Sequence, residues 1–367
     1  MSEYDEGLSR IIGDLALKLA SSQRAAADYN SDNVSRESYG AQLSDERAIK
    51  VVHNYATRPK PGHIIFTMQY DNTCYQLNPS SGVIEFLFEV RQLRKPFLWR
   101  AVSDGRGILY ASVGGGRFRH GPYDYAVMDR WGGIFSIDFR SQAVKIISVG
   151  QHLLMPCFVD ILDEDNLLCC GTSDFNSSGA VYSINVRSGA QRFVYSHPRL
   201  RDPVSASYDE SGDLWIANSD QNTQDGELIR VSPNGEVKAV VPFSGTNTGA
   251  VCGVCIPRND EGVVITKMNW PYMIGGLIAQ VSRAGGEIEP IMSSTGESPK
   301  FFSTGCAVEG DDVWFAENYS KRIIRYNLKK KNVVREYDVS SLLGGNYQGM
   351  RNSYMCVENL SVVPDLR

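Results

Sequence analysis

The sequence predicts an all-β fold, a six-bladed β-propeller with four-stranded antiparallel blades, and two observations support this prediction. The first is a recurring short segment of alternating apolar and polar residues, whose copies end at Asn78, Asp138, Asn185, Ser232, Ser282 and Asn327. Successive ends are 45 to 60 residues apart, which is the spacing of propeller blades. The second is a small-residue turn that follows this segment at residues 80–82, 187–189, 233–235 and 284–286.

Residues 213–241 show the repeating unit most clearly, in the sequence DLWIANSDQNTQDGELIRVSPNGEVKAVV. DLWIA and ELIRVS alternate, Asn234-Gly235 supplies the positive backbone dihedrals of a tight hairpin, and EVKAVV resumes the alternation. A further strand precedes this run and ends at the turn over residues 209–212. Each unit is therefore an antiparallel meander, and meanders bury both faces by packing side by side around an axis.

The N-terminal segment differs from the repeats, and we assign residues 1–47 to a helix and a polar linker and residues 48–367 to the propeller. An apolar stripe at helical spacing predicts an amphipathic helix over residues 7–27, formed by Leu8, Ile11, Ile12, Leu15 and Leu19. Packing against the main fold is the simplest role for the stripe. A homodimer contact is the alternative.

Two segments are left over once the repeats are assigned, residues 48–56 and 355–364. Both have strand character. We expect one or both to complete the first blade, because such pairing joins the two ends of the chain and closes the ring.

Composition narrows the classes of partner and compartment. The formal net charge of −5 and a pI of about 5.7 argue against nucleic acid and anionic membranes as partners. The N-terminus lacks the pattern of a signal peptide, so we expect a cytoplasmic protein. We also expect its partner to be a small-molecule substrate. The eight cysteines are then expected to be free thiols.

The connection between the second and third strands of each unit varies most in length, and all six such loops are expected at one end of the ring, here called the rim. Glu317 directly follows a strand of the sixth unit and is the first candidate for a catalytic acid or base. Asn318 and Tyr319 lie beside it, and residues at matching places in other units are further candidates for substrate binding: Asn218, Asp220, Asp174, Asn269 and Asp71. Turn formation alone also favours Asp and Asn at such positions.

The rim loop of the second unit, residues 113–132, is the longest and is a candidate lid. It contains His120 as a second catalytic candidate and Tyr123, Tyr125 and Trp131 as candidate substrate contacts. An ordered surface insertion is the alternative interpretation.

Cys252 and Cys255 have CxxC spacing, but no second pair of Cys or His supports a tetrahedral metal site. They are expected on an innermost strand, where small apolar residues fit the crowded axis.

The segments DESGDLWIA, ELIRVSPNGEV and DDVWFAENYSKRIIRYNL resemble the gluconolactonase/regucalcin and strictosidine-synthase-like superfamily of six-bladed propellers, a resemblance that covers roughly residues 60–338. The lactonase branch implies hydrolysis of cyclic esters with a divalent cation in the channel. The chain has Pro203-Val204-Ser205 where that branch has Pro-Asp-Gly, so the ligands of such a cation are unassigned. The strictosidine-synthase-like branch implies metal-free condensation or cyclisation with a single glutamate.

Three functional hypotheses follow. The first is a small-molecule enzyme with a pocket on the rim and lactonase-like hydrolysis or related acid/base chemistry; the second is metal-free chemistry with one glutamate. The third is a non-catalytic propeller that binds a protein or ligand on the same rim.

Overall fold

The structure is a computed structural model, and it describes the following residues: 50–53, 56–68, 72–91, 96–115, 117–119, 125–127, 132–150, 153, 155–172, 179–220, 225–243, 250–257, 262–268, 276–284, 287–295, 300, 302–342, 357 and 359–365. The predicted N-terminal helix and linker lie outside these ranges. No helix among the described residues is long and apolar enough to cross a membrane.

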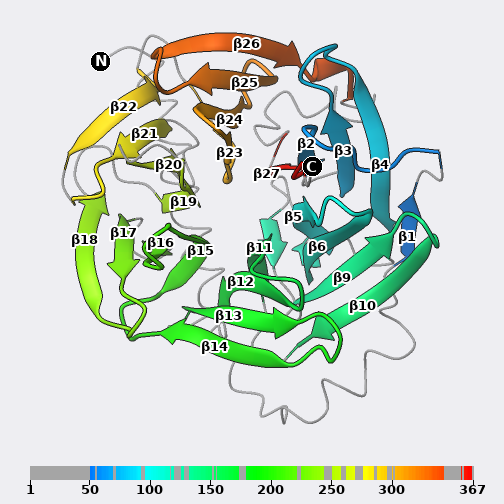
Figure 1. The fold of residues 1–367 in the computed structure, drawn as a ribbon, viewed down its shortest axis with the longest axis horizontal. Coiled ribbons are helices and arrows are strands. Elements are labelled where there is room, and N and C mark those ends of the chain that lie inside the picture. Colours follow the sequence, from blue (N-terminus) through cyan, green and yellow to red (C-terminus); the bar gives the residue numbers. More distant parts are fainter. Residues whose placement is uncertain are drawn as a thin grey trace. The chain divides into compact units, whose positions relative to one another are not determined.

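Six antiparallel sheets stand around a central axis, as the sequence predicts (Figure 1). Blades 2 to 4 are four-stranded meanders. Blade 2 is β5 (Pro96–Ser103), β6 (Ile108–Gly115), β9 (Gly132–Asp138) and β10 (Ala143–Val149). Blade 3 is β11 (Met155–Ile161), β12 (Asn166–Thr172), β13 (Gly179–Asn185) and β14 (Gln191–Ser196). Blade 4 is β15 (Asp202–Tyr208), β16 (Leu214–Asp220), β17 (Asp225–Val231) and β18 (Val237–Phe243).

The last two blades repeat the same order of strands from the axis outward. Blade 5 is β19 (Ala250–Cys255), β20 (Val263–Met268), β21 (Leu277–Val281) and β22 (Ile288–Ser293). Blade 6 is β23 (Ala307–Glu309), β24 (Asp312–Glu317), β25 (Arg322–Asn327) and β26 (Asn332–Asp338), followed by a short 3₁₀ helix, η1 (Ser340–Leu342).

Blade 1 closes the ring with strands from both ends of the described chain. Its order is β27 (Asn359–Val362), β2 (Ile64–Met68), β3 (Thr73–Leu77), β4 (Ile84–Arg91) and β1 (Lys50–His53). The C-terminal strand β27 is the innermost and pairs with β2, whereas β1 covers the outer edge of β4. Both leftover segments of the sequence therefore take part in closure, as expected.

The innermost strands of blades 2 to 5 each have a β-bulge or irregular register near their start that the alternation in the sequence did not reveal. The register shifts at Trp99 in β5, Val204 in β15 and Cys252 in β19. A bulge bends and twists the strand that carries it, and here it occurs near the start of each strand. Val204, at the position where the lactonase resemblance would place an acid, is thus a bulge residue.

Apolar side chains fill the seams between blades. Trp215 of blade 4 packs with Val251 and Ile265 of blade 5, and Trp215 itself is fully buried. Blades 5 and 6 meet in a similar cluster that includes Phe302 and Phe315. Burial of each such side chain stabilises the fold by roughly 1.5–3 kcal/mol, so the seams hold the ring together.

In blades 4 and 6 an arginine lies over a tryptophan ring and donates a hydrogen bond to an aspartate, which explains the similar sequences DLWIA and DVWFA. Arg230 is the register partner of Trp215, its guanidinium carbon lies 5.1 Å from the ring centroid, and its Nε donates a 2.7 Å hydrogen bond to Asp213. In blade 6 the register partners are Trp314 and Arg325, with 5.3 Å from guanidinium carbon to ring centroid. The pattern Asp-x-Trp with an opposing Arg therefore stabilises the blades.

Candidate functional site

Glu317 is the last residue of β24, and its side chain organises the turn that follows. One carboxylate oxygen accepts a 3.0 Å hydrogen bond from the backbone N–H of Tyr319, and the other accepts a 2.9 Å bond from that of Ser320. Glu317 is buried with 3% exposure, while Tyr319 is 37% exposed. These contacts give Glu317 a structural role in the rim turn, and its catalytic role stays a prediction.

The rim asparagines support the inner strands. The Oδ1 atoms of Asn72, Asn218 and Asn318 each accept a hydrogen bond from a backbone N–H, at 3.0, 3.1 and 2.9 Å respectively. The three donors are Leu98 in β5, Arg201 just before β15 and Val357 just before β27. Because the donors belong to different inner strands or their approaches, these amides fix the strands at the rim. Ligand binding by Asn218 and Asn318 remains a prediction.

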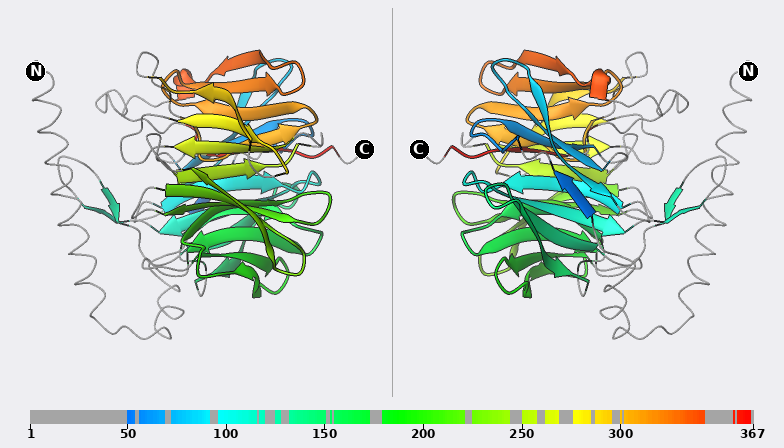
Figure 2. Two further views of the ribbon diagram at one scale, coloured as in Figure 1. Left: turned by 90° about the vertical axis from the view of Figure 1, so that its left-hand side faces the viewer. Right: turned by 90° about the vertical axis from the view of Figure 1, so that its right-hand side faces the viewer.

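The remaining rim candidates lie wholly or partly outside the described residues. His120, Tyr123, Trp131, Asp71, Asp174 and Asn269 are outside them. Asp220 and Tyr125 are described by their backbone alone, at the end of β16 and the start of β8 (Tyr125–Val127). The candidate lid contains a hairpin of β7 (Arg117–Arg119) and β8. Figure 2 shows this hairpin standing off the ring on the side opposite to the C-terminus.

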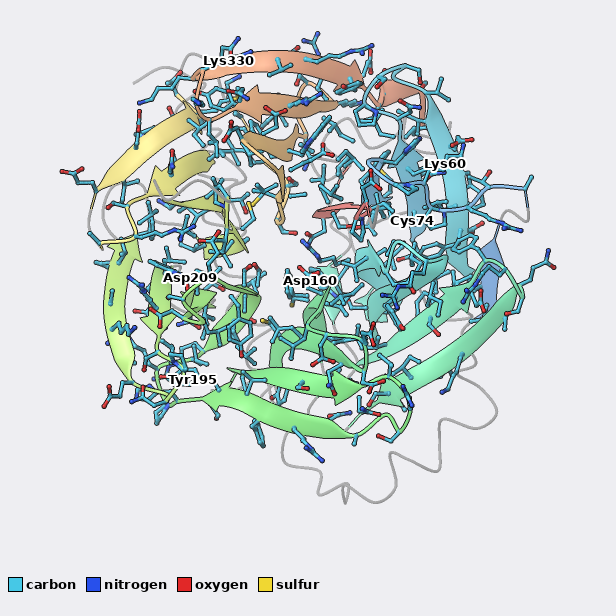
Figure 3. All side chains as sticks on the ribbon, in the orientation of Figure 1. Lys60, Cys74, Asp160, Tyr195, Asp209 and Lys330 are labelled. Carbon is cyan, nitrogen blue, oxygen red and sulfur yellow. The ribbon has the colours of Figure 1, made fainter. Side chains whose placement is uncertain are left out.

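The described residues form a cavity of about 510 Å³ at the end of the channel opposite the rim. Every blade contributes to its wall through an inner strand: Arg100 in β5, Asp160 in β11, Ser207 in β15, Cys255 in β19, Ala307 in β23 and Ser361 in β27. Several of these residues are near the ends of their strands. The first-turn residues Asp104, Arg106, Asp163 and Glu164 extend the wall outward. Asp160 lies close to the centre of the ring in Figure 3.

Arg100 is the charged residue held deepest in this wall. Its side chain is 7% exposed, and its guanidinium carbon lies 4.5 Å from the centroid of the Phe158 ring. Nη1 donates a 2.7 Å hydrogen bond to Oδ1 of Asn359, and Nη2 donates a 3.4 Å bond to Oδ2 of Asp160. Nε has no hydrogen-bond partner among the described residues. Arg100 lines the cavity and also retains a buried, unused donor in its Nε, which is costly unless a ligand or water accepts from it.

Acidic side chains line the outer part of the same cavity on the side formed by blades 2 and 3. Arg106 pairs with Glu164 at 3.2 Å, and both side chains are largely exposed. Asp104 and Asp163 also line the wall. The lining has two cationic and four anionic side chains in all, a formal charge of −2, although the deepest charged residue is cationic. The cavity is therefore electrostatically polarised along its depth.

Two buried cations were missed by the sequence-based search. Arg100 lies in the middle of the innermost strand PFLWRAVS. A charged residue on an innermost strand is unusual, and this was the signal in the sequence that could have identified it. Lys267 ends the segment VVITK, whereas the equivalent segments end in Thr67, Ser112, Gly171, Ala217 and Ala316. Lys267 is 4% exposed, and burial lowers the pKa of its ammonium group. Both residues depart from the repeat pattern, and a residue-by-residue comparison of the six copies identifies them.

Among the described residues, no three His, Cys, Asp or Glu side chains are grouped so as to hold a metal ion. The seven described cysteines are free thiols, as predicted. Cys255 and Cys306 both line the cavity.

Comparison with known proteins supports the fold. No protein-family model and no curated protein matches the chain. A chain in the crystal structure of a nidogen/laminin complex is similar at 9% identity with a TM-score of 0.55, covering 82% of this chain and 98% of that one. A protein of unknown function from Bacteroides caccae is similar at 10% identity with a TM-score of 0.50, covering 82% of this chain and 98% of that one.

A third similar structure is the calcium-binding protein regucalcin from Agrobacterium tumefaciens, at 14% identity with a TM-score of 0.44, covering 66% of this chain and 74% of that one. Identities this low speak to architecture and leave the reaction open. The first two chains, with TM-scores of 0.55 and 0.50, are therefore similar to this chain in overall fold.

Proposed function

We propose that this protein binds a small organic molecule in the channel cavity and that Arg100 recognises a carboxylate of that molecule. The observation that carries the proposal is the buried guanidinium whose Nε lacks a described partner beside a cavity lined by all six blades. A cavity of about 510 Å³ falls within the range of roughly 300–1,000 Å³ typical of small-molecule sites.

The chemistry of arginine favours a carboxylate over a neutral group. A guanidinium offers several N–H donors in one plane, and a carboxylate can accept two of them at once. Asn359 occupies Nη1, and the bond from Nη2 to Asp160 is long at 3.4 Å, which leaves Nε and Nη2 as the pair that a ligand would engage. Desolvation of Arg100 strengthens such a bond.

The acidic outer wall restricts the rest of the ligand. Asp104, Asp163 and Glu164 would repel a second anionic group placed near them. They would attract an ammonium group or accept hydrogen bonds from hydroxyl groups. The ligand class is therefore a small carboxylic acid whose far end is cationic or hydroxylated, such as an amino acid or a sugar acid.

Thermal unfolding of the full chain with defined probes tests this assignment. Glycine, γ-aminobutyrate, gluconate and succinate would be added separately, with the matching amides, which lack the carboxylate, as controls. A rise in the unfolding midpoint with a hydroxylated or amino-bearing carboxylate, and its loss in Arg100→Met, is the expected result. Arg140→Met on the outer surface is the matched control, since that side chain is 58% exposed. A shift that survives in Arg100→Met contradicts the proposal.

Acid/base chemistry on the rim, with Glu317 as the catalytic residue, is a second candidate, and it is favoured by the burial of Glu317 at the end of β24. Lactonase-like hydrolysis and the metal-free alternative differ in their need for a cation. Elemental analysis of the purified chain separates them, because a stoichiometric divalent ion supports cation-dependent hydrolysis. The substrate is expected to reach Glu317 from the rim.

A further inference from the structure

Two cysteine thiols meet across the seam between blades 5 and 6. Cys255 is the last residue of β19, and Cys306 directly precedes β23. Their Sγ atoms lie 2.8 Å apart, although 51 positions separate the residues in the chain. Cys255 is 9% exposed and Cys306 is 2% exposed, and both line the channel cavity.

The backbones of the two blades also approach closely at this point. The Thr266 hydroxyl donates a 2.7 Å hydrogen bond to the carbonyl oxygen of Thr304. A Cβ added to Gly253 would lie 2.7 Å from the same carbonyl oxygen and 3.1 Å from the Cα of Gly305. Glycine at position 253 is thus what lets β19 approach the chain segment that enters β23. These backbone contacts, which do not involve the thiols, bring the two sulfur atoms close together.

We propose that Cys255 and Cys306 are an oxidation site, at which a reversible disulfide forms and covalently joins blades 5 and 6 at the cavity wall. The inference depends on the fold and on the two thiols, and it is independent of the ligand proposed above.

The surroundings of the pair favour a neutral product. Both cysteines belong to an apolar cluster with Val264, Phe302 and Phe315. Burial raises the pKa of Cys255, as does its hydrogen bond with Cys306, while the charge of Arg100 acts in the opposite direction. Burial therefore disfavours the thiolate, but it places no such penalty on an uncharged disulfide. Oxidation through the small thiolate fraction is expected to be slow, and the product is expected to persist.

Hydrogen peroxide is a suitable oxidant, because it is small enough to enter the cavity. The Cys255 thiolate attacks one peroxide oxygen, the O–O bond breaks, and the departing hydroxide takes up a proton to become water. Cys306 then attacks the sulfur of the resulting sulfenic acid, and the S–O bond breaks to release a second water. Two thiols and one peroxide thus give one disulfide and two waters.

Peptide mapping of the full chain after peroxide treatment tests the site. Free thiols are alkylated, and the protein is digested with trypsin without reduction. Residues 239–258 and 301–321 form the two relevant tryptic peptides. The expected result is a cross-linked pair of these peptides that is lighter by two hydrogen atoms than their sum and that dithiothreitol separates.

The first peptide also contains Cys252, which provides a matched control. Cys252 is buried and lies on the same strand, with its Sγ 3.5 Å from the carbonyl oxygen of Ala250. Cys252→Ser is expected to retain the cross-link, and Cys255→Ser is expected to abolish it. The proposal is overturned if peroxide leaves both wild-type peptides separately alkylated, if it gives only sulfinic acid at either cysteine, or if the cross-link maps to Cys252. The peptide map of the wild-type protein tests the proposal even if one of the variants fails to fold.

Discussion

Arg100 and Asn359 are joined by a 2.7 Å hydrogen bond from Nη1 to Oδ1, although they are 259 positions apart in the chain. Arg100 belongs to the inner strand of blade 2 and Asn359 begins the C-terminal strand that closes blade 1. Both residues are buried, at 6% and 3% exposure. The same contact therefore helps to close the ring and to orient the cationic residue of the proposed ligand site.

Replacement of Asn359 by Leu is expected to destabilise the protein by about 1–3 kcal/mol, because Nη1 of a buried guanidinium then loses its acceptor. Urea unfolding measures the change. Asn332→Leu is the control, since Asn332 is exposed on the outer strand β26. Equal effects of the two substitutions would mean that the Arg100 contact contributes nothing to closure.

Gly305→Ala tests the packing beneath that contact. A Cβ at position 305 would lie 1.6 Å from Oδ1 of Asn359, so the carboxamide has to move away from Arg100. We expect a loss of about 1–3 kcal/mol, as for other overpacked sites. Gly310→Asn is the control, because no atom lies within 4 Å of its added Cβ and Asn tolerates a φ of 61°. An unchanged unfolding midpoint for Gly305→Ala would mean that position 305 has room for a Cβ and that the Asn359 side chain is not tightly packed against it.

The fold was predictable because its determinants are local. Alternation such as ELIRVS and turns such as Asn234-Gly235 lie within a few residues of one another, and their repetition gives the blade count. The bulges at Trp99, Val204 and Cys252 were not predictable, since one extra residue in a strand leaves the apolar composition unchanged.

The cavity could not be predicted in the same way. Loop length directed attention to the rim, whereas the described cavity lies at the other end and is formed by side chains from six strands far apart in sequence. The charge of Arg100 within its strand is visible in the sequence, but its partners Asn359 and Asp160 are known only from the folded ring. Contacts such as that of Cys255 with Cys306 depend on the ring geometry, which local patterns do not specify.

Asp209 gives the fold an acid-sensitive contact in blade 4. Burial alone raises the pKa of Asp209, but hydrogen bonds from Ser211, the Trp215 indole and the Asp213 backbone outweigh it, so the net shift is downward. A lowered folded pKa means that this carboxylate stabilises the protein above the ordinary Asp range of about 4 and that the contribution is lost as the pH falls through the folded value.

Asp209→Asn is therefore expected to lose about 1–3 kcal/mol at pH 7, because a buried charged acceptor is replaced by a neutral amide. The difference from wild type is expected to shrink as the pH falls below about 4. Urea unfolding at several pH values measures both, with the exposed Asp163→Asn as the control. A difference that stays constant with pH would contradict the assignment.

Glu317→Gln tests the rim hypothesis with a change of one atom. Gln keeps one oxygen for the N–H of Tyr319 or Ser320 but loses the other acceptor, so the expected cost is about 1 kcal/mol of stability. A catalytic acid or base cannot be replaced by an amide, so kcat is expected to fall by about 10²-fold or more on any lactone that the wild type hydrolyses.

A panel of γ- and δ-lactones, with hydrolysis followed by proton release, provides the assay. Glu336→Gln is the control in the same blade, because Glu336 is exposed and pairs with Arg322. Hydrolysis at the wild-type rate by Glu317→Gln would restrict Glu317 to its structural role in the turn after β24.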